Sequence, residues 1–305
     1  MLIDLVQLRT FVSVAEEQHL TRAAERMHIS QSAASAHVRA VEDTLDTQLF
    51  VRTRRNLELT PAGHLLLPEA KVLLHQATLF ASLARRIRGE RKGTLVVGVS
   101  SEPSASRIGK VMAALQAQHP AIHVDLRARH SSGTRQALKT GEIDIGFLLA
   151  HAAGNEFSRY KLASLRFRVA GPAAWKDRIA QADWEELASL PWITPSSSSL
   201  AYSAMLAELF TQRGLELNTV AHFDNIVLAR TLLKDGVGMM LMREDHALQE
   251  EREGHVAISP LAQAEFPLYM EHLTGRKNDP LISAFVDAVS CAWPGMALAG
   301  APMPS

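Results

Sequence analysis

The chain has 305 residues, of which 47% are hydrophobic and 21% are charged. Its length predicts two or three globular domains. The chain has 32 basic and 32 acidic side chains, so its net charge alone does not indicate a nucleic-acid partner. The single cysteine excludes an intrachain disulfide framework, and the lack of a signal peptide or an apolar run of bilayer length predicts a cytoplasmic protein without membrane contact.

The first 45 residues predict three helices. Apolar residues at helical spacing predict the first helix over residues 4–17. Thr21 is expected to cap a short helix over residues 22–27, and Ser30 is expected to cap a third helix over residues 31–45. The third helix should bury Ala34, Val38, Val41 and Leu45 and leave Gln31, Ser32, Ser35 and Arg39 facing solvent.

A wing and a long helix are predicted next. The stretch "QLFVRTRRNLELT" alternates in strand fashion around Asn56, which predicts two short strands with arginines at their tip. Thr60 and Pro61 then start a helix that runs to about Gly89. Its apolar residues follow a seven-residue repeat, which favours pairing with a second copy over packing on its own domain. The predicted dimerisation positions are Leu66, Ala70, Leu73, Ala77, Phe80, Ala84 and Ile87.

The second half of the chain alternates strand-like and helix-like segments. This rhythm predicts parallel sheets covered by helices, arranged as two α/β subdomains with a cleft between them. The predicted helices include residues 104–118, residues 200–213 and a last helix over residues 280–292. The final residues, 294–305, are predicted to form a flexible tail.

The N-terminal pattern of helix, turn, helix and wing is the geometry that places one helix in a DNA major groove. Gln31 can contact adenine, the serines can bond phosphates or base edges, and the wing arginines can hold the backbone. Because acidic and basic residues nearly balance over residues 1–60, we expect DNA binding to depend on contacts from individual side chains and not on net charge. The alternative is a small helical protein-interaction domain. The candidate DNA-binding residues are Thr21, Ser30, Gln31, Ser32, Ser35, His37, Arg39, Arg52, Arg54 and Arg55.

The motifs "TRAAERMHISQSAAS", "VEDTLDTQLFVR" and "LTPAG" resemble the winged helix-turn-helix of the LysR-type transcriptional regulators, nearly continuously over residues 5–63. "GEIDIGFL" and "LLKDGVGMMLM" extend the resemblance into the second half. It implies a homodimer through the linker helix, a homotetramer, and binding of double-stranded DNA at an interrupted inverted repeat. It also implies a small-molecule effector, with RNA polymerase as a further candidate partner. Asp46 departs from the family pattern, because it replaces a usual glycine after the third helix.

The resemblance also implies a domain order. It consists of a DNA-binding domain over residues 1–60, a linker helix and hinge over residues 61–92, and an effector-binding domain over residues 93–293. The last comprises two Rossmann-like α/β subdomains of periplasmic-binding-protein type. Subdomain I takes residues 93–164 and 267–293, and subdomain II takes residues 165–266.

Candidate effector-binding residues lie at predicted strand ends. Hydroxyls beside the first N–H groups of a helix favour a small anion such as a carboxylate, although serines also cap helices without any ligand. The residues selected in this way are Ser100, Ser101, Ser104, Thr194 and Ser197, with Phe223 and Asp224 at a third strand end. By resemblance, Ser100, Ser131, Phe147, Ser199 and Tyr202 match pocket positions. Arg127 and Arg129 are weaker candidates for holding a carboxylate.

The sequence predicts no enzyme, cofactor or metal site. It contains no HExxH, GxSxG, Walker or clustered Cys/His pattern. The alternative to a transcriptional regulator is a cytosolic small-molecule-binding module of periplasmic type that acts through protein–protein contacts.

Overall fold

The computed structural model describes residues 3–52, 57–87, 92–100, 103–150, 155–197 and 201–298. The chain divides into two compact units, one formed mainly by residues up to 90 and one by residues from 91 onward. Within the described ranges, no helix is long and apolar enough to cross a bilayer.

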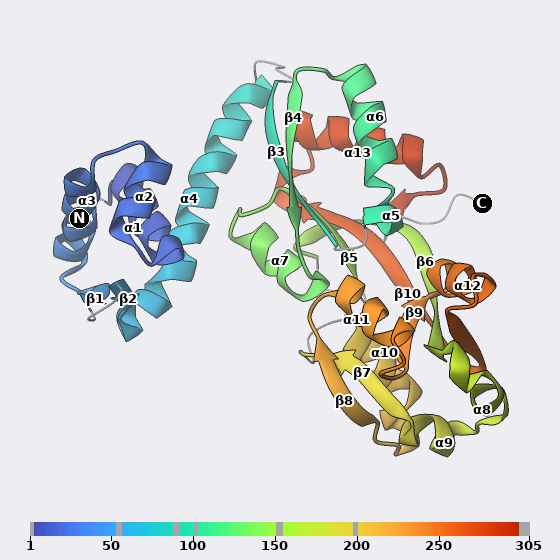
Figure 1. Cartoon of the computed structure of the whole chain (residues 1–305). Helices are drawn as coiled ribbons and strands as arrows, with labels where there is room; N and C mark the ends of the chain where they lie inside the picture. The colour runs from blue at the N-terminus through green and yellow to red at the C-terminus, as the bar shows by residue number, and fades with distance from the viewer. Residues whose placement is uncertain are drawn as a thin grey trace. The chain divides into compact units, whose positions relative to one another are not determined.

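The first unit begins with three helices: α1 (Leu5–Glu17), α2 (Leu20–Met27) and α3 (Gln31–Leu45) (Figure 1). Ser30 caps α3 as predicted, since its Oγ accepts the N–H of Ala33 at 3.1 Å. The prediction that Thr21 caps α2 is wrong. The helix starts one residue earlier than Thr21, because the ring of His19 accepts the Thr21 N–H at 3.2 Å and therefore takes the capping role.

The wing consists of β1 (Phe50–Arg52) and β2 (Leu57–Leu59), which pair antiparallel. The side chain of Glu42 in α3 fixes the entry into this wing, because its Oε1 accepts the backbone N–H groups of Leu49 at 2.8 Å and Phe50 at 3.2 Å. Phe50 in turn packs edge-on against Phe11 of α1, with ring centroids 5.6 Å apart. These contacts attach the wing to the same core that holds α3.

Helix α4 (Pro61–Ile87) follows, and Thr60 Oγ1 caps it by accepting the Gly63 N–H at 2.9 Å. The predicted seven-residue repeat divides into two parts. Ala70 is buried in the core that α1 forms with the wing, and Leu66 packs against that core. Farther along, Phe80 and Ile87 are 77% and 78% exposed. The second part of the repeat is therefore an uncovered apolar face.

The second unit is built on a seven-stranded sheet. Its order is β11 (Ala297–Leu298), β6 (Phe157–Pro172), β10 (Val256–Leu273), β5 (Ile145–Leu149), β3 (Gly93–Val99) and β4 (Ile122–Ala128), with β9 (Met240–Arg243) also paired to β6. A separate parallel pair is formed by β7 (Pro191–Pro195) and β8 (Asn218–Phe223). Strand β3 is parallel to both β4 and β5, as the alternating pattern predicted.

Helices cover these strands in two groups. Near β3 to β5 the helices are α5 (Pro103–Ser106), α6 (Ile108–Gln118), α7 (Ser131–Lys139) and α13 (Pro280–Ala292). The others are α8 (Lys176–Gln181), α9 (Trp184–Ser189), α10 (Ala201–Leu209), α11 (Ile226–Lys234) and α12 (Glu244–Arg252). Short 3-10 turns occupy Ala173–Trp175, Thr211–Arg213 and Thr274–Arg276. In Figure 1, α6 and α13 lie together against β3 and β4.

The antiparallel strands β6 and β10 run through both groups. Leu162 and Leu268 belong to the core under α6 and α13, whereas Phe167 and Phe266 belong to a second core around Trp192. These two long strands are therefore the connection between the two α/β halves, and the cleft described below lies where the halves face each other.

The helix predicted over residues 104–118 is wrong at one point, because it breaks at Arg107, whose φ is 53°. The Arg107 guanidinium lies 3.9 Å from the ring centre of Trp293 and donates to the carbonyl of Ala292 at 3.0 Å. The indole N–H of Trp293 donates to the Ser106 carbonyl at 3.2 Å. Contacts with the end of α13 thus set the orientation of α5.

Three other expectations need correction. The helix predicted over residues 200–213 ends at Leu209 and continues only as a 3-10 turn. Helices α8, α9 and α12 were not predicted. The tail that was expected to lack structure carries the two-residue strand β11, which pairs with β6.

Candidate DNA-binding surface and effector cleft

The first turn of α3 presents a polar surface. Gln31, Ser32 and Arg39 are exposed and Ser35 is half-buried, while Ala34 and Val38 on the same helix are buried. Ser30 Oγ and Ser32 Oγ lie 2.9 Å apart, so the two hydroxyls at the helix start are hydrogen-bonded to each other. The polar stripe that the sequence predicted is therefore on the surface, on a helix held by apolar contacts.

The remaining DNA-binding candidates have different surroundings. His37 is half-buried, and its Nδ1 lies 2.9 Å from Thr10 Oγ1 on α1. Thr21 is half-buried in the first turn of α2. Arg52 ends β1, and its side chain, together with Arg54 and Arg55, lies outside the described residues.

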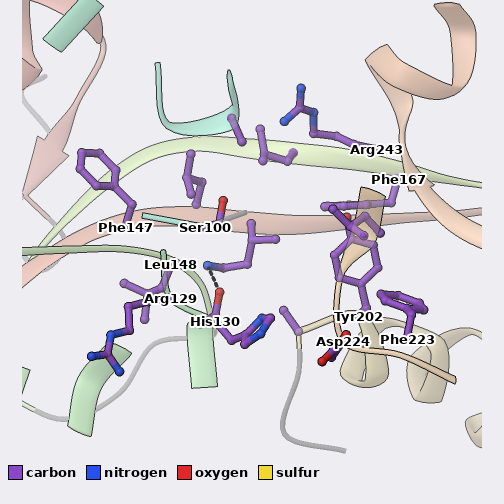
Figure 2. Close-up of a pocket in the computed structure, with 17 residues that line it drawn as sticks. Ser100, Arg129, His130, Phe147, Leu148, Phe167, Tyr202, Phe223, Asp224 and Arg243 are labelled. Carbon is purple, nitrogen blue, oxygen red and sulfur yellow. Dashed lines mark hydrogen bonds between the residues drawn. The ribbon is translucent and has the colours of Figure 1, made fainter. Parts of the chain in front are cut away.

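A cleft of about 700 Å³, part of it open to solvent, lies between the two α/β halves of the second unit. Phe147 lies at one end, and Tyr202 and Phe223 lie at the other (Figure 2). The cleft is lined by Ser100, Ala105, Arg129, His130, Ser131, Phe147, Leu148, Leu149, Leu165, Phe167, Ala201, Tyr202, Phe223, Asp224, Ile226, Arg243 and Leu268.

Seven residues named from the sequence line this cleft: Ser100, Arg129, Ser131, Phe147, Tyr202, Phe223 and Asp224. Ser101 and Ser199 lie outside the described residues. Thr194 is buried in β7, where its Oγ1 lies 3.1 Å from His222 Nδ1, and Ser197 accepts a hydrogen bond from Ser203 through its carbonyl. Neither Thr194 nor Ser197 contributes to the lining.

Aromatic rings form the apolar wall of the cleft. Tyr202 stands edge-on to Phe167 at 5.4 Å and to Phe223 at 6.2 Å between ring centroids. On the opposite side, Ser131 Oγ accepts the backbone N–H of Leu149 at 3.0 Å, which joins the start of α7 to the end of β5. The wall is thus apolar, and it favours a ligand with a flat or hydrophobic body.

Arg243 is a charged lining residue that the sequence did not identify. It ends the buried strand β9, only 6% of it is exposed, and its guanidinium pairs with Asp245 at 2.5 and 2.6 Å. Burial alone would raise the pKa of Asp245, but the hydrogen bonds and positive charge of Arg243 outweigh burial and lower that pKa. An arginine at the end of a methionine-rich buried strand was the available sequence signal.

Arg243 also reaches Ser104 of α5, which comes from the other half. Its Nη2 lies 3.0 Å from Ser104 Oγ and 3.0 Å from His246 Nε2, in addition to Asp245. One guanidinium nitrogen has two hydrogens for these three acceptors. Ser104 and His246 therefore compete for a single N–H, since the charged Asp245 forms the shortest contact.

His246 is subject to the same limit. Its Nδ1 lies 2.9 Å from Nη1 of Arg230 on α11, while its Nε2 faces Arg243. A neutral imidazole accepts at only one nitrogen, so it cannot take hydrogens from both arginines. The group formed by Ser104, Arg243, His246 and Arg230 consequently has two alternative hydrogen-bonding arrangements, which link the cleft to α11.

Among the other charged residues, one arginine lines the cleft and several residues form ion pairs elsewhere. Arg129 lines the cleft, whereas Arg127 pairs with Asp125 at 3.0 Å on an exposed strand. Glu250, Glu253 and His255 gather three possible metal-binding atoms, but Glu250 already pairs with Lys234 at 2.7 Å. Burial opposes ionisation of Glu250, and hydrogen bonds from Lys234 and His255 outweigh burial and lower its pKa. This cluster is therefore a set of ion pairs.

Comparison with known proteins identifies both units. Residues 5–64 match the family described as bacterial regulatory helix-turn-helix protein, lysR family, and residues 88–293 match the LysR substrate binding domain. The transcriptional regulator AlsR of Bacillus subtilis is 28% identical over 297 residues, covering 95% of this chain and 96% of AlsR. The transcriptional regulator BenM of Acinetobacter baylyi is 27% identical over 245 residues, covering 79% and 80%.

Solved structures share the fold. A full-length variant of OxyR from Pseudomonas aeruginosa matches with a TM-score of 0.66 at 21% identity, covering 95% of both chains. Full-length CbnR in complex with its target DNA matches with a TM-score of 0.65 at 20% identity, covering 95% of this chain and 99% of CbnR. The relatives found by sequence are transcriptional regulators, not enzymes.

Proposed function

Because the chain belongs to the LysR family of DNA-binding transcriptional regulators, we propose that it binds an interrupted inverted-repeat operator and that its contacts with this operator change when a small anionic effector occupies the cleft. A chromosomal target implies action in the cytoplasm. The observation that carries the proposal is a polar recognition helix in a chain that also has a cleft lined by aromatic rings and a buried arginine.

An inverted repeat requires two copies of the recognition helix. The uncovered apolar positions of α4, among them Leu73, Phe80 and Ile87, support dimerisation through this helix. A dimer would place two α3 helices on half-sites related by twofold symmetry, and a pair of dimers would form the homotetramer. Gln31, Ser32, Ser35 and Arg39 are the side chains that would then face the major groove, with Arg52, Arg54 and Arg55 at the backbone.

The effector is best described as a carboxylate on an apolar body. Arg243 supplies the positive charge at the edge of the cleft, and the rings of Phe167, Tyr202 and Phe223 supply an apolar surface. A guanidinium favours carboxylates because hydrogen bonds between two charged groups are stronger than neutral ones. Ser100 and Ser131 remain proposed contacts for the polar end of the ligand.

The link between cleft and DNA is proposed to be a population shift. Arg243 and Ser104 come from the two opposing α/β halves, so a ligand that engages Arg243 would change which of the two hydrogen-bonding arrangements is preferred. The change would alter the separation of the two α/β halves and thereby the spacing of recognition helices in the oligomer. Such a shift is limited by the difference in ligand affinity between the two arrangements.

The proposal is tested by selection from a randomised double-stranded DNA library with the full-length chain, followed by a thermal-shift screen of metabolites. The expected result is enrichment of one inverted repeat and a ligand that raises the unfolding midpoint as its concentration increases. Recovery of unenriched DNA would count against operator binding. Stabilisation by neutral ligands alone would count against the anionic effector.

A further inference from the structure

His37 lies six residues after Gln31 on the recognition helix α3. Its neighbours one turn away on the same side are Ala33 and Ala40, which are short. The imidazole is therefore the longest side chain on its flank of the helix. Among the described residues, the contact with Thr10 at 2.9 Å is the only hydrogen bond of His37.

Thr10 is fully buried, and its Oγ1 makes two short contacts. The hydroxyl donates to the carbonyl of Val6 at 2.9 Å, and it lies 2.9 Å from His37 Nδ1. A hydroxyl has a single hydrogen. If that hydrogen pointed at His37, the contact with Val6 would place two oxygen lone pairs against each other. A hydrogen lies in both contacts only if Nδ1–H of His37 donates to Thr10.

This arrangement fixes the tautomer of the neutral ring. With the proton on Nδ1, His37 Nε2 is a hydrogen-bond acceptor. An acceptor is repelled by phosphate oxygens and by the N7 and O6 atoms of guanine. It is matched by the exocyclic amino groups of adenine and cytosine, which project into the major groove.

We propose that His37 reads an amino-bearing base, adenine or cytosine, in each half-site of the operator, and that Thr10 is the positioning residue that holds His37 as an acceptor. The inference rests on the proposed entry of α3 into the major groove. Thr10 is buried inside the domain and touches no DNA in this arrangement, so its effect on base preference can act only through the ring of His37.

The test is the same selection from a randomised duplex library at pH 7.5, carried out with full-length wild type, His37→Ala, Thr10→Val and Thr10→Ser. Wild type is expected to prefer adenine or cytosine about 5-fold at one position of each half-site, as befits one base-edge hydrogen bond. His37→Ala should remove the preference at that position alone. Thr10→Val should relax or reverse it at the same position, and Thr10→Ser, which keeps the hydroxyl, should restore it.

The outcomes separate this inference from the proposed function. No enrichment by wild type would overturn operator binding itself. An unchanged preference in His37→Ala, or a wild-type preference for guanine or thymine at the position that His37→Ala alters, would overturn the reading by His37. If Thr10→Val shows the same base preference as wild type at that position, the role of Thr10 is overturned. Circular dichroism of each variant separates these results from misfolding, and Thr10→Ala removes the hydroxyl in its place if Thr10→Val does not fold.

Discussion

Arg243 Nη2 lies 3.0 Å from Ser104 Oγ, and the two side chains come from the two α/β halves that face each other across the cleft. Ser104 sits on α5, whose orientation depends on the stacking of Arg107 on Trp293. Arg243 is held by Asp245 from its own half. Contacts within its own half therefore hold each of the two side chains. The distance between Ser104 and Arg243 consequently depends on the separation of the two halves.

Arg243→Met should weaken recognition of the effector carboxylate. We expect a loss of about 10- to 100-fold in affinity for a carboxylate found in the screen, because hydrogen bonds to charged groups contribute more than neutral ones. Isothermal titration calorimetry measures this loss. The matched control is Arg166→Met, since the exposed Arg166 pairs with Glu244 but does not line the cleft. Equal affinities for wild type and Arg243→Met would contradict the assignment of Arg243.

Phe80→Asp should disrupt dimerisation through α4. Phe80 is 77% exposed in the single chain, and a charge at the centre of a helix–helix contact would be buried without a partner. Sedimentation equilibrium is expected to show a loss of the dimer. Gln76→Asp, an exposed change on the same helix, serves as the control. An unchanged mass for Phe80→Asp would show that another surface holds the copies together.

Glu42→Ala should weaken DNA binding without touching the DNA surface. The carboxylate accepts the backbone N–H groups of Leu49 and Phe50 at the start of the wing, so its removal leaves these groups unpaired. The expected cost is about 1–3 kcal/mol of unfolding free energy, with a larger loss of operator affinity than in Glu42→Gln, whose amide oxygen still accepts. Denaturation and fluorescence anisotropy measure the two effects, and Asp43→Ala is the exposed control.

Asp46→Gly should stabilise the first unit. Asp46 ends α3 with φ at 48°, a left-handed conformation that glycine adopts without strain. The expected gain is about 0.5–1 kcal/mol, less the greater freedom of glycine in the unfolded chain. Asp43→Gly, inside the same helix, should instead destabilise by about 0.3 kcal/mol, the difference between the helix propensities of aspartate and glycine. The two changes have opposite signs, so thermal unfolding of both variants distinguishes local strain from a general effect of glycine.

The features that the sequence predicted depend on neighbouring residues. Ser30 and Thr60 cap their helices as expected, since a cap joins groups three residues apart. The last helix runs over Pro280–Ala292 as predicted, because a proline at its start and an apolar repeat define it locally. Among the cleft residues, Phe223 and Asp224 were found from a predicted strand end, Ser131, Phe147 and Tyr202 from the family resemblance, and Ser100 from both.

The features that the sequence missed depend on distant residues. The break at Arg107 follows from its stacking on Trp293, far along the chain, which no local pattern contains. Arg243 resembles any other arginine until β9 is buried and Asp245, His246 and Ser104 gather around it. The sequence did not point to His19 as the cap of α2, because ring nitrogens rarely cap helices.

Footprinting of the full-length wild-type protein on the selected operator, with and without the carboxylate from the screen, tests the central claim most directly. If the cleft controls DNA binding, the ligand should change the protected length or the affinity at the operator, with no such change for Arg243→Met. An identical footprint and affinity with saturating ligand, in a protein whose unfolding midpoint the ligand raises, would contradict the account.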